Sequence, residues 1–156
     1  MRIRLIAAGT RMPDWVRQGF AEYASRLPKQ CALELTEIRL GNRTRSAPAA
    51  RAVAQEGQRM LAAVQASDRV VALDVKGIEM DSAGLSQRLE QWMRDGPDVA
   101  LLVGGPDGLA APCLERSESV WALSRLTLPH GLVRVMVAEQ LYRAWSLLNS
   151  HPYHRP

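Results

Sequence analysis

The side chains best suited to acid–base chemistry gather in the last third of the chain. All three histidines of the 156-residue sequence, His130, His151 and His154, lie there, and histidine is the side chain that titrates closest to neutral pH. Tyr153 and Arg155 flank the last histidine. A histidine can remove a proton, a tyrosine ring can stack on a flat base, and an arginine can pair with an anion. We therefore expect the reactive groups of the protein in this region.

A short strand and a long helix are predicted to carry these residues. Residues 123–128 alternate weakly between apolar and polar types and predict a strand that ends before Pro129. Apolar residues then recur at helical spacing, which predicts a helix over residues 131–150. Its apolar stripe consists of Val133, Val137, Leu141, Trp145 and Leu148. Arg134 falls on the face shared with Leu141 and Trp145, which is unusual for a solvated charge.

The rest of the chain alternates between strand and helix patterns. Apolar runs predict strands at residues 3–8, 31–40, 69–75 and 99–103, and amphipathic segments between them predict helices. The runs 69–75 and 99–103 are typical of strands buried on both faces, as in parallel sheets. We therefore predict an α/β fold with a mostly parallel sheet flanked by helices. The length suits a single domain over residues 1–156.

Composition and motif content narrow the class of protein. No apolar run reaches the length that crosses a membrane, and the first residues are too short a run for a signal peptide, so we expect a cytoplasmic protein. Cys31 and Cys113 lack metal-site spacing, and we expect no bound metal. There is no dinucleotide fingerprint, P-loop, nucleophile elbow or His-Glu-x-x-His motif. These absences argue against an oxidoreductase, a hydrolase and a metalloenzyme.

Charge is unevenly distributed along the chain, whose formal net charge is +4. Residues 39–69 contain six basic and two acidic residues, whereas residues 70–128 contain five basic and nine acidic ones. A basic patch is the electrostatic footprint expected of a protein that binds a polyanion. Arg43 and Arg45, in the polar stretch 41–48, are candidate phosphate contacts. Two solvated arginines on an exposed loop explain the same pattern equally well.

A glycine-rich turn follows the apolar run 99–103. Glycines in Gly104-Gly-Pro-Asp-Gly108 permit close approach of the backbone to a ligand. Open α/β sheets bind ligands where their parallel strands end. We expect this turn, the end of the third predicted strand near Leu73, and residues 126–129 to form one crevice. Taken alone, such a sequence more often marks only a turn.

The C-terminal motifs resemble those of the RlmH family of ribosomal RNA methyltransferases, which belongs to the SPOUT class. The matching segments are Leu126-Thr-Leu-Pro-His130, Val133-Arg-Val135, Ala138-Glu-Gln-Leu-Tyr-Arg-Ala-Trp145 and His151-Pro-Tyr-His-Arg155. Gly9-Thr10, Pro13-Asp-Trp15 and Gly104-Gly-Pro106 also fit, so the resemblance covers nearly the whole chain. The sequence departs from the family pattern at Gly131, where a second proline is expected. The resemblance implies a SPOUT-type fold with a C-terminal trefoil knot.

The resemblance also implies an activity. It implies an S-adenosyl-L-methionine-dependent methyltransferase that methylates N3 of a pseudouridine in a stem-loop of 23S ribosomal RNA within the ribosome, acting as a homodimer without metal. By matching position, the cofactor-binding residues are Leu73, Gly104, Gly105, Leu123, Ser124, Arg125, Leu126, Thr127 and Leu128. Because the N3 proton must leave, the site needs a base or a group that stabilises an anion.

The candidates for these roles come from the C-terminal region and the basic loop. The expected catalytic residues are His130, Arg134, Tyr153 and His154, and the expected RNA-binding residues are Arg43, Arg45, Arg143 and Arg155. Glu139 is expected only to pair with Arg143 along the helix. The apolar excess of residues 133–137 and the reactive tail indicate a dimer interface along the last helix. A non-catalytic RNA- or ribosome-binding α/β module is the alternative function.

Overall fold

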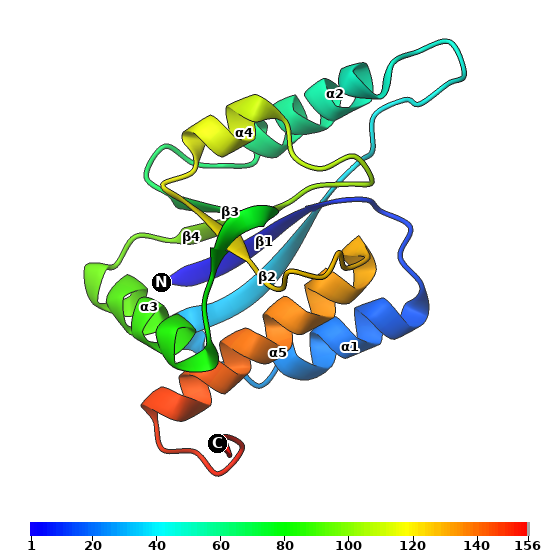
Figure 1. Cartoon of the computed structure of the whole chain (residues 1–156). Coiled ribbons are helices and arrows are strands. Elements are labelled where there is room, and N and C mark those ends of the chain that lie inside the picture. The colour runs from blue at the N-terminus through cyan, green and yellow to red at the C-terminus, as the bar shows by residue number, and fades with distance from the viewer. Residues whose placement is uncertain (156) are drawn as a thin grey trace.

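A five-stranded parallel sheet forms the middle layer of the structure, a computed structural model that describes residues 1–155 (Figure 1). The strands are β1 (Arg2–Ala8), β2 (Ala32–Ile38), β3 (Arg69–Glu79), β4 (Val99–Val103) and β5 (Ser119–Ala122). Their order across the sheet is β2-β1-β4-β3-β5, and every neighbouring pair is parallel. The predicted α/β class and parallel sheet are confirmed.

Helices cover both faces of this sheet (Figure 1). On one face lie α1 (Asp14–Ala24), α3 (Ser82–Asp95) and α5 (His130–Leu148), and on the other lie α2 (Ala49–Ala62) and α4 (Ala111–Arg116). A short 3-10 helix, η1 (Lys29–Cys31), precedes β2. Asp81 caps α3 by accepting a hydrogen bond from the Gly84 amide at 2.7 Å.

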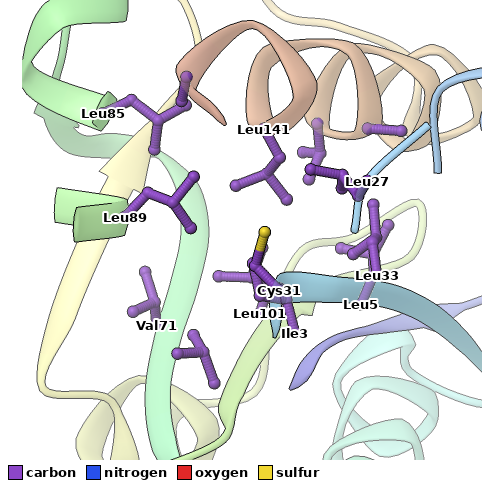
Figure 2. Close-up of a cluster of buried hydrophobic side chains, with 14 of the residues drawn as sticks. Ile3, Leu5, Leu27, Cys31, Leu33, Val71, Leu85, Leu89, Leu101 and Leu141 are labelled. Carbon is purple, nitrogen blue, oxygen red and sulfur yellow. The ribbon is translucent and has the colours of Figure 1, made fainter. Parts of the chain in front are cut away.

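Alternation along the strands divides the core into two clusters. Odd-numbered residues of β1, β3 and β4 point to the side of α1, α3 and α5, and even-numbered ones point to the side of α2 and α4. Figure 2 shows the larger cluster, in which Leu141 of α5 and Leu85 and Leu89 of α3 lie over the strands. Both sheet faces are therefore apolar, which explains why the central strands read as continuous apolar runs.

The predicted strand at residues 123–128 is wrong. The last strand lies earlier, at Ser119–Ala122, where it pairs with β3 at the border of the sheet. Residues 123–129 leave the sheet without further strand pairing, and the Ser124 hydroxyl accepts a hydrogen bond from the Leu126 amide at 3.0 Å. A serine bonded to its own backbone in this way favours a turn over a strand. This loop instead folds over the ends of the strands.

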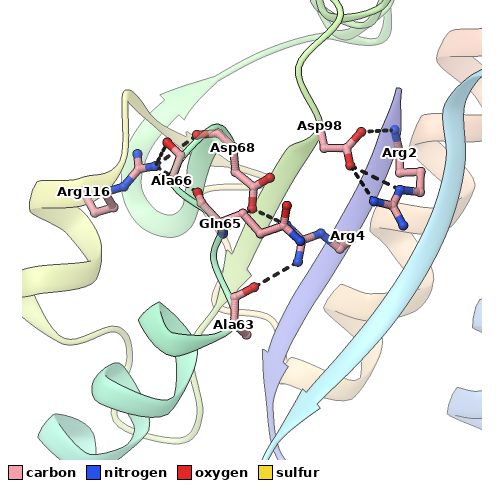
Figure 3. Close-up of polar contacts among 8 residues, drawn as sticks. All are labelled: Arg2, Arg4, Ala63, Gln65, Ala66, Asp68, Asp98 and Arg116. Carbon is pink, nitrogen blue, oxygen red and sulfur yellow. Dashed lines mark hydrogen bonds and ion pairs between the residues drawn. The ribbon is translucent and has the colours of Figure 1, made fainter.

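The end of the sheet at which the strands begin is closed by ion pairs, as Figure 3 shows. Arg4 pairs with the buried Asp68, whose other oxygen has no hydrogen-bond partner within residues 1–155, and Arg2 pairs with Asp98 at 3.0 Å. Arg116 donates to the backbone carbonyl of Asp68 at 3.1 Å. We call this side the amino end of the sheet and the opposite side, where all five strands finish, the carboxyl end.

Candidate functional site

A cavity of about 490 Å³ opens at the carboxyl end of the sheet. Three segments wall it: the middle of β3 where its pairing with β4 ends, the turn after β4, and the loop that leads from β5 into α5. The lining residues are Leu73, Asp74, Val75, Val103, Gly104, Gly105, Pro106, Gly108, Leu109, Trp121, Leu123, Ser124, Leu126, Thr127, Leu128, Pro129, His130 and Val133. Its volume and mostly apolar lining are those of a small-molecule site.

Eight of the nine residues expected to hold a cofactor line this cavity. They are Leu73, Gly104, Gly105, Leu123, Ser124, Leu126, Thr127 and Leu128. Arg125 does not line it: its side chain is 91% exposed, and its Nε lies 3.9 Å from a Glu79 carboxylate oxygen. The expected crevice therefore exists, with the Arg125 side chain directed away from it.

Gly104 shapes the cavity wall for a reason that the sequence did not reveal. A Cβ at this position would lie 2.5 Å from the carbonyl carbon of Gly108 and 2.8 Å from the Leu109 nitrogen. The turn therefore folds back onto Gly104 itself, closed by a 3.1 Å hydrogen bond from the Gly108 amide to the Gly105 carbonyl. Gly108 has a φ of +83°, which favours glycine. The glycines thus fix the shape of the wall, rather than simply leaving room for a ligand.

His130 is the titrating group that the structure places in the cavity wall. It is the first residue of α5, and burial together with the positive charge of Arg134 lowers the pKa of its imidazole below the usual value. The amino terminus of a helix also disfavours a cation. The neutral imidazole is therefore the stable form at neutral pH, and this form can accept a proton.

Arg134 lies beneath the site and does not line the cavity. Its side chain is 1% exposed and donates hydrogen bonds to the Gly9 carbonyl and to Glu37 Oε2, both at 2.7 Å. These contacts tie α5 to the ends of β1 and β2. The structure thus gives Arg134 a structural role, in contrast to the expected contact with the reacting base. It also explains the charge on an apolar helix face, because the guanidinium reaches the buried Gly9 carbonyl and the partly exposed Glu37 carboxylate.

The C-terminal tail packs on the last turns of α5. The Tyr153 hydroxyl donates to Glu139 Oε1 at 2.8 Å, and its ring lies 4.7 Å from the Tyr142 ring. The Arg143 guanidinium lies 5.1 Å from the centre of the Tyr153 ring and also donates from Nε to Glu139 at 3.0 Å. Burial and the hydrogen bond to Glu139 raise the pKa of Tyr153. Glu139 is therefore more than a helix partner for Arg143, because it also holds the tail.

The two groups of expected catalytic residues lie at opposite ends of α5 (Figure 1). His130 is the first residue of this 19-residue helix, and the tail follows its last residue. At 1.5 Å per residue, the two ends are about 28 Å apart. His154, partly buried in the tail, has a backbone amide that donates to the His151 carbonyl at 3.3 Å. One chain therefore does not bring Tyr153 and His154 to its own cavity.

The arginines expected to bind RNA are in different environments. Arg43 donates to both carboxylate oxygens of Glu56, at 2.6 and 3.1 Å, and to Asp107 at 2.9 Å. Glu56 is 3% exposed, and these hydrogen bonds raise the pKa of Arg43. Arg43 is thus occupied within the protein. Arg45 and Arg155 are exposed and form no hydrogen bond or ion pair within residues 1–155.

Sequence reasoning missed one informative residue of the cavity wall. Trp121 was not among the expected site residues, yet it lines the cavity, and its buried indole N–H has no partner among the described residues. A buried donor without a partner is costly unless a ligand completes it. Its position at the end of an apolar strand was the available clue.

Two further findings concern metal ions and membranes. Within residues 1–155 there is no cluster of three or more histidine, cysteine, aspartate or glutamate side chains arranged to hold a metal ion. No helix in the described part of the chain is long and apolar enough to cross a membrane.

Solved structures support the fold. A probable methyltransferase from Bordetella pertussis superposes with a TM-score of 0.58 at 16% identity, covering 92% of this chain and 95% of that one. A probable methylase family protein from Haemophilus influenzae gives a TM-score of 0.55 at 12% identity, over 99% of this chain and 70% of that one. At these identities the likeness concerns the fold alone.

Sequence comparisons are far closer. Residues 1–154 match the family described as "Predicted SPOUT methyltransferase". The protein named ribosomal RNA large subunit methyltransferase H from Methylococcus capsulatus is 56% identical over 99% of this chain and its own full length. The protein of the same name from a Marinomonas species is 53% identical over the same shares. The chain therefore belongs to the SPOUT methyltransferase family and, within it, to the RlmH family.

Proposed function

We propose that this protein is an S-adenosyl-L-methionine-dependent methyltransferase that methylates N3 of a pseudouridine in a stem-loop of 23S ribosomal RNA. One observation carries this proposal. Segments that the family resemblance assigns to the cofactor, from three separate parts of the chain, wall a single cavity where the strands end. The relatives at 53% and 56% identity are named as methyltransferases of large-subunit ribosomal RNA.

The cavity suits the proposed cofactor in size and chemistry. Its volume of about 490 Å³ and its apolar wall can enclose a flat base between Leu73 and Leu128. The Trp121 ring adds an aromatic surface to the wall. The Asp74 carboxylate in the wall can face a positive charge. S-adenosyl-L-methionine, when bound, supplies a methyl group on a positively charged sulfur.

His130 is the group best placed to remove the N3 proton. An imide nitrogen keeps its proton at neutral pH and is then a poor nucleophile, so the proton must leave as the methyl group arrives. The lowered pKa of His130 keeps its imidazole unprotonated at neutral pH. Its place in the cavity wall puts it beside any group that the cavity holds. Arg134 assists indirectly, by anchoring the first turns of α5 to the sheet.

A homodimer is part of the proposal. The tail packs on the later turns of α5, and none of Tyr153, His154 and Arg155 lines the cavity of the same chain. A second subunit can bring its tail to this cavity, and a symmetric dimer then forms two equivalent composite sites. The apolar excess of α5 supports an interface less directly than expected, because Val135 packs on Gly19 and Val137 is buried in the core. Leu132 and Met136 stay partly exposed. The trefoil knot, the cytoplasmic location and the ribosome as the form of the substrate remain predictions.

Calorimetry and methyl transfer test the proposal together. Titration of the protein with S-adenosyl-L-methionine is expected to give saturable heat. Transfer of labelled methyl groups is expected to intact ribosomes, separated subunits or naked 23S RNA, and the preferred form identifies the substrate. The alternative, a non-catalytic RNA-binding module, predicts RNA binding without cofactor heat. RNA binding with no saturable heat would therefore overturn the enzymatic proposal.

A further inference from the structure

Basic side chains at the two ends of the sheet differ in what they contact. At the amino end, Arg2, Arg4, Arg69 and Arg116 are held by carboxylates or backbone carbonyls. At the carboxyl end, the side chains of four exposed arginines form no hydrogen bond or ion pair with any residue that the structure describes. They are Arg11, Arg39, Arg45 and Arg51. We call these four residues the basic strip.

The basic strip occupies one side of the carboxyl end. Arg11 follows β1 and Arg39 follows β2, two neighbouring strands paired up to Ala8 and Ile38. The Gly9 amide extends this pairing with a 2.7 Å hydrogen bond to the Ile38 carbonyl. Arg45 lies in the loop after β2, and Arg51 lies in the first turn of α2. All four thus leave the sheet on the side where the cavity opens.

The loop that carries the basic strip is attached to the cavity wall. Arg43 bridges the buried Glu56 of α2 and Asp107, which belongs to the turn between Gly104 and Gly108. Leu40 packs on the same turn, since a Cβ at Gly105 would lie 3.0 Å from Leu40 Cδ2. The Gly41 amide donates to Glu56 Oε2 at 2.9 Å. An anion bound by the basic strip would therefore lie beside the cavity mouth.

Stability does not account for these free charges. Residues 39–55 contain four arginines and no acidic residue, and like charges this close repel one another. Arg51 lies in the first turn of α2, which has no acidic residue there. The positive end of the helix dipole disfavours a cation at that position. Among the four arginines of residues 39–55, only Arg43 is paired with carboxylates, and it anchors the loop to α2 and to the turn after β4.

We infer that the basic strip binds backbone phosphates of the RNA next to the nucleotide that enters the cavity. This inference rests on the proposed function and specifies how the substrate is held. RNA is the occupant that the charge fits, because it is a polyanion with regularly spaced phosphates. Contacts of this kind position the RNA without reading its sequence. Arg11, Arg39 and Arg51 thereby join Arg45 as RNA contacts, whereas Arg43 holds the loop in place.

The test removes two charges from the basic strip and compares them with two free charges elsewhere. The variant is Arg39→Gln with Arg45→Gln. The matched control is Lys29→Gln with Arg88→Gln, two cations that also have no ion pair within residues 1–155 and lie away from the cavity. Affinity for a pseudouridine-containing stem-loop RNA is measured over a range of salt concentrations, and cofactor affinity is measured by calorimetry.

The expected result is a change in salt dependence confined to the basic strip. Each lost phosphate contact lowers the slope of log affinity against log salt by roughly 0.7 to 0.9. The Arg39/Arg45 variant should therefore lose roughly 1.5 in slope, and the control should keep the slope of the unsubstituted protein. Cofactor affinity should stay the same in both. Equal slopes for the variant and the unsubstituted protein would overturn the inference.

Other outcomes separate this inference from the proposed function. If the variant binds the stem-loop normally but loses affinity for intact ribosomes, the basic strip binds an acidic protein, and the inference is wrong. If the unsubstituted protein binds RNA with the predicted slopes but transfers no methyl group, the proposed function fails and the basic strip remains an RNA contact.

Discussion

The two ends of α5 contrast in what they hold. At its amino end, His130 lines the cavity and Arg134 is fixed to the sheet by buried hydrogen bonds. At its carboxyl end, an aromatic and ionic cluster around Tyr153 fastens the tail to the outside of the helix. The first end is built into the core, whereas at the second end Tyr153 and His154 are only partly buried. The residues expected to act together thus lie at different places along one helix.

This contrast is the reason that the proposed function includes a second subunit. Helix α5 is about 28 Å long and rigid, so no loop movement within one chain brings its two ends together. In a dimer, a rigid helix can hold its tail at a fixed position on the other subunit. The following predictions test the division of labour between the two ends.

Ending the chain at Pro152 should have the largest effect. The deletion removes Tyr153, His154 and Arg155, but no residue of the cavity wall. Methyl transfer should fall below detection. Cofactor affinity measured by calorimetry should change by no more than about twofold, which corresponds to less than about 0.5 kcal/mol. Normal turnover by the shortened protein would mean that the tail has no catalytic role.

A mixing experiment sharpens this prediction. The shortened chain keeps His130, and a His130→Gln chain keeps the tail, so a mixed dimer contains one complete composite site. Activity should return when the two inactive chains are refolded together. If the mixture stays inactive, although each variant binds cofactor and dimerises, the tail does not act across the subunits.

Replacing His130 with glutamine should lower methyl transfer by roughly 100-fold, the usual contribution of a general base. Because its pKa is lowered, His130 is neutral at pH 7 and becomes protonated only at more acidic pH. The rate of the unsubstituted protein should therefore decline as the pH falls through this lowered pKa. The His130→Gln variant should lack that acidic decline, and a variant with an unchanged pH profile would exclude His130 as the base.

Arg134→Leu should affect stability more than chemistry. It leaves the buried Gly9 carbonyl without its donor and frees the partly exposed Glu37, and an unsatisfied buried polar group typically costs about 1 to 3 kcal/mol. Urea unfolding should show this loss. The control is Arg17→Leu, which breaks the exposed pair with Asp14 and should change the free energy of unfolding by about 0.5 kcal/mol or less. Equal losses in the two variants would contradict the anchoring role.

The sequence predicted best what depends on local pattern. The strand Val99–Val103 was predicted with its observed bounds, because five consecutive apolar residues are followed by two glycines. The cavity wall was also anticipated, since parallel strands place their following loops together. The strand at residues 123–128 failed because a weak alternation does not distinguish a strand from a loop folded over an apolar wall.

What the sequence could not provide depends on contacts between distant residues. Arg134 donates hydrogen bonds to Glu37 and Gly9, which lie 97 and 125 positions away along the chain. The role of Gly104 depends on a turn that folds back onto it. Arg43 looked like a free phosphate contact until Glu56 and Asp107 were seen beside it. Charge in the sequence therefore indicates candidates, and only the fold shows which charges are already paired.

Tyr153→Phe should give the smallest effect and the finest distinction between the two ends of α5. The change removes only the hydroxyl that donates to Glu139, and the ring keeps its contacts with Tyr142 and Arg143. Loss of one such hydrogen bond costs about 1 kcal/mol, which corresponds to roughly a fivefold change. Because the tail is then less firmly held, the methyl-transfer rate should drop by up to about that factor, with cofactor affinity unchanged. Tyr153→Leu, which also removes the aromatic ring, should reduce the rate further. If both variants turned over like the unsubstituted protein, the cluster at the carboxyl end of α5 would serve packing alone.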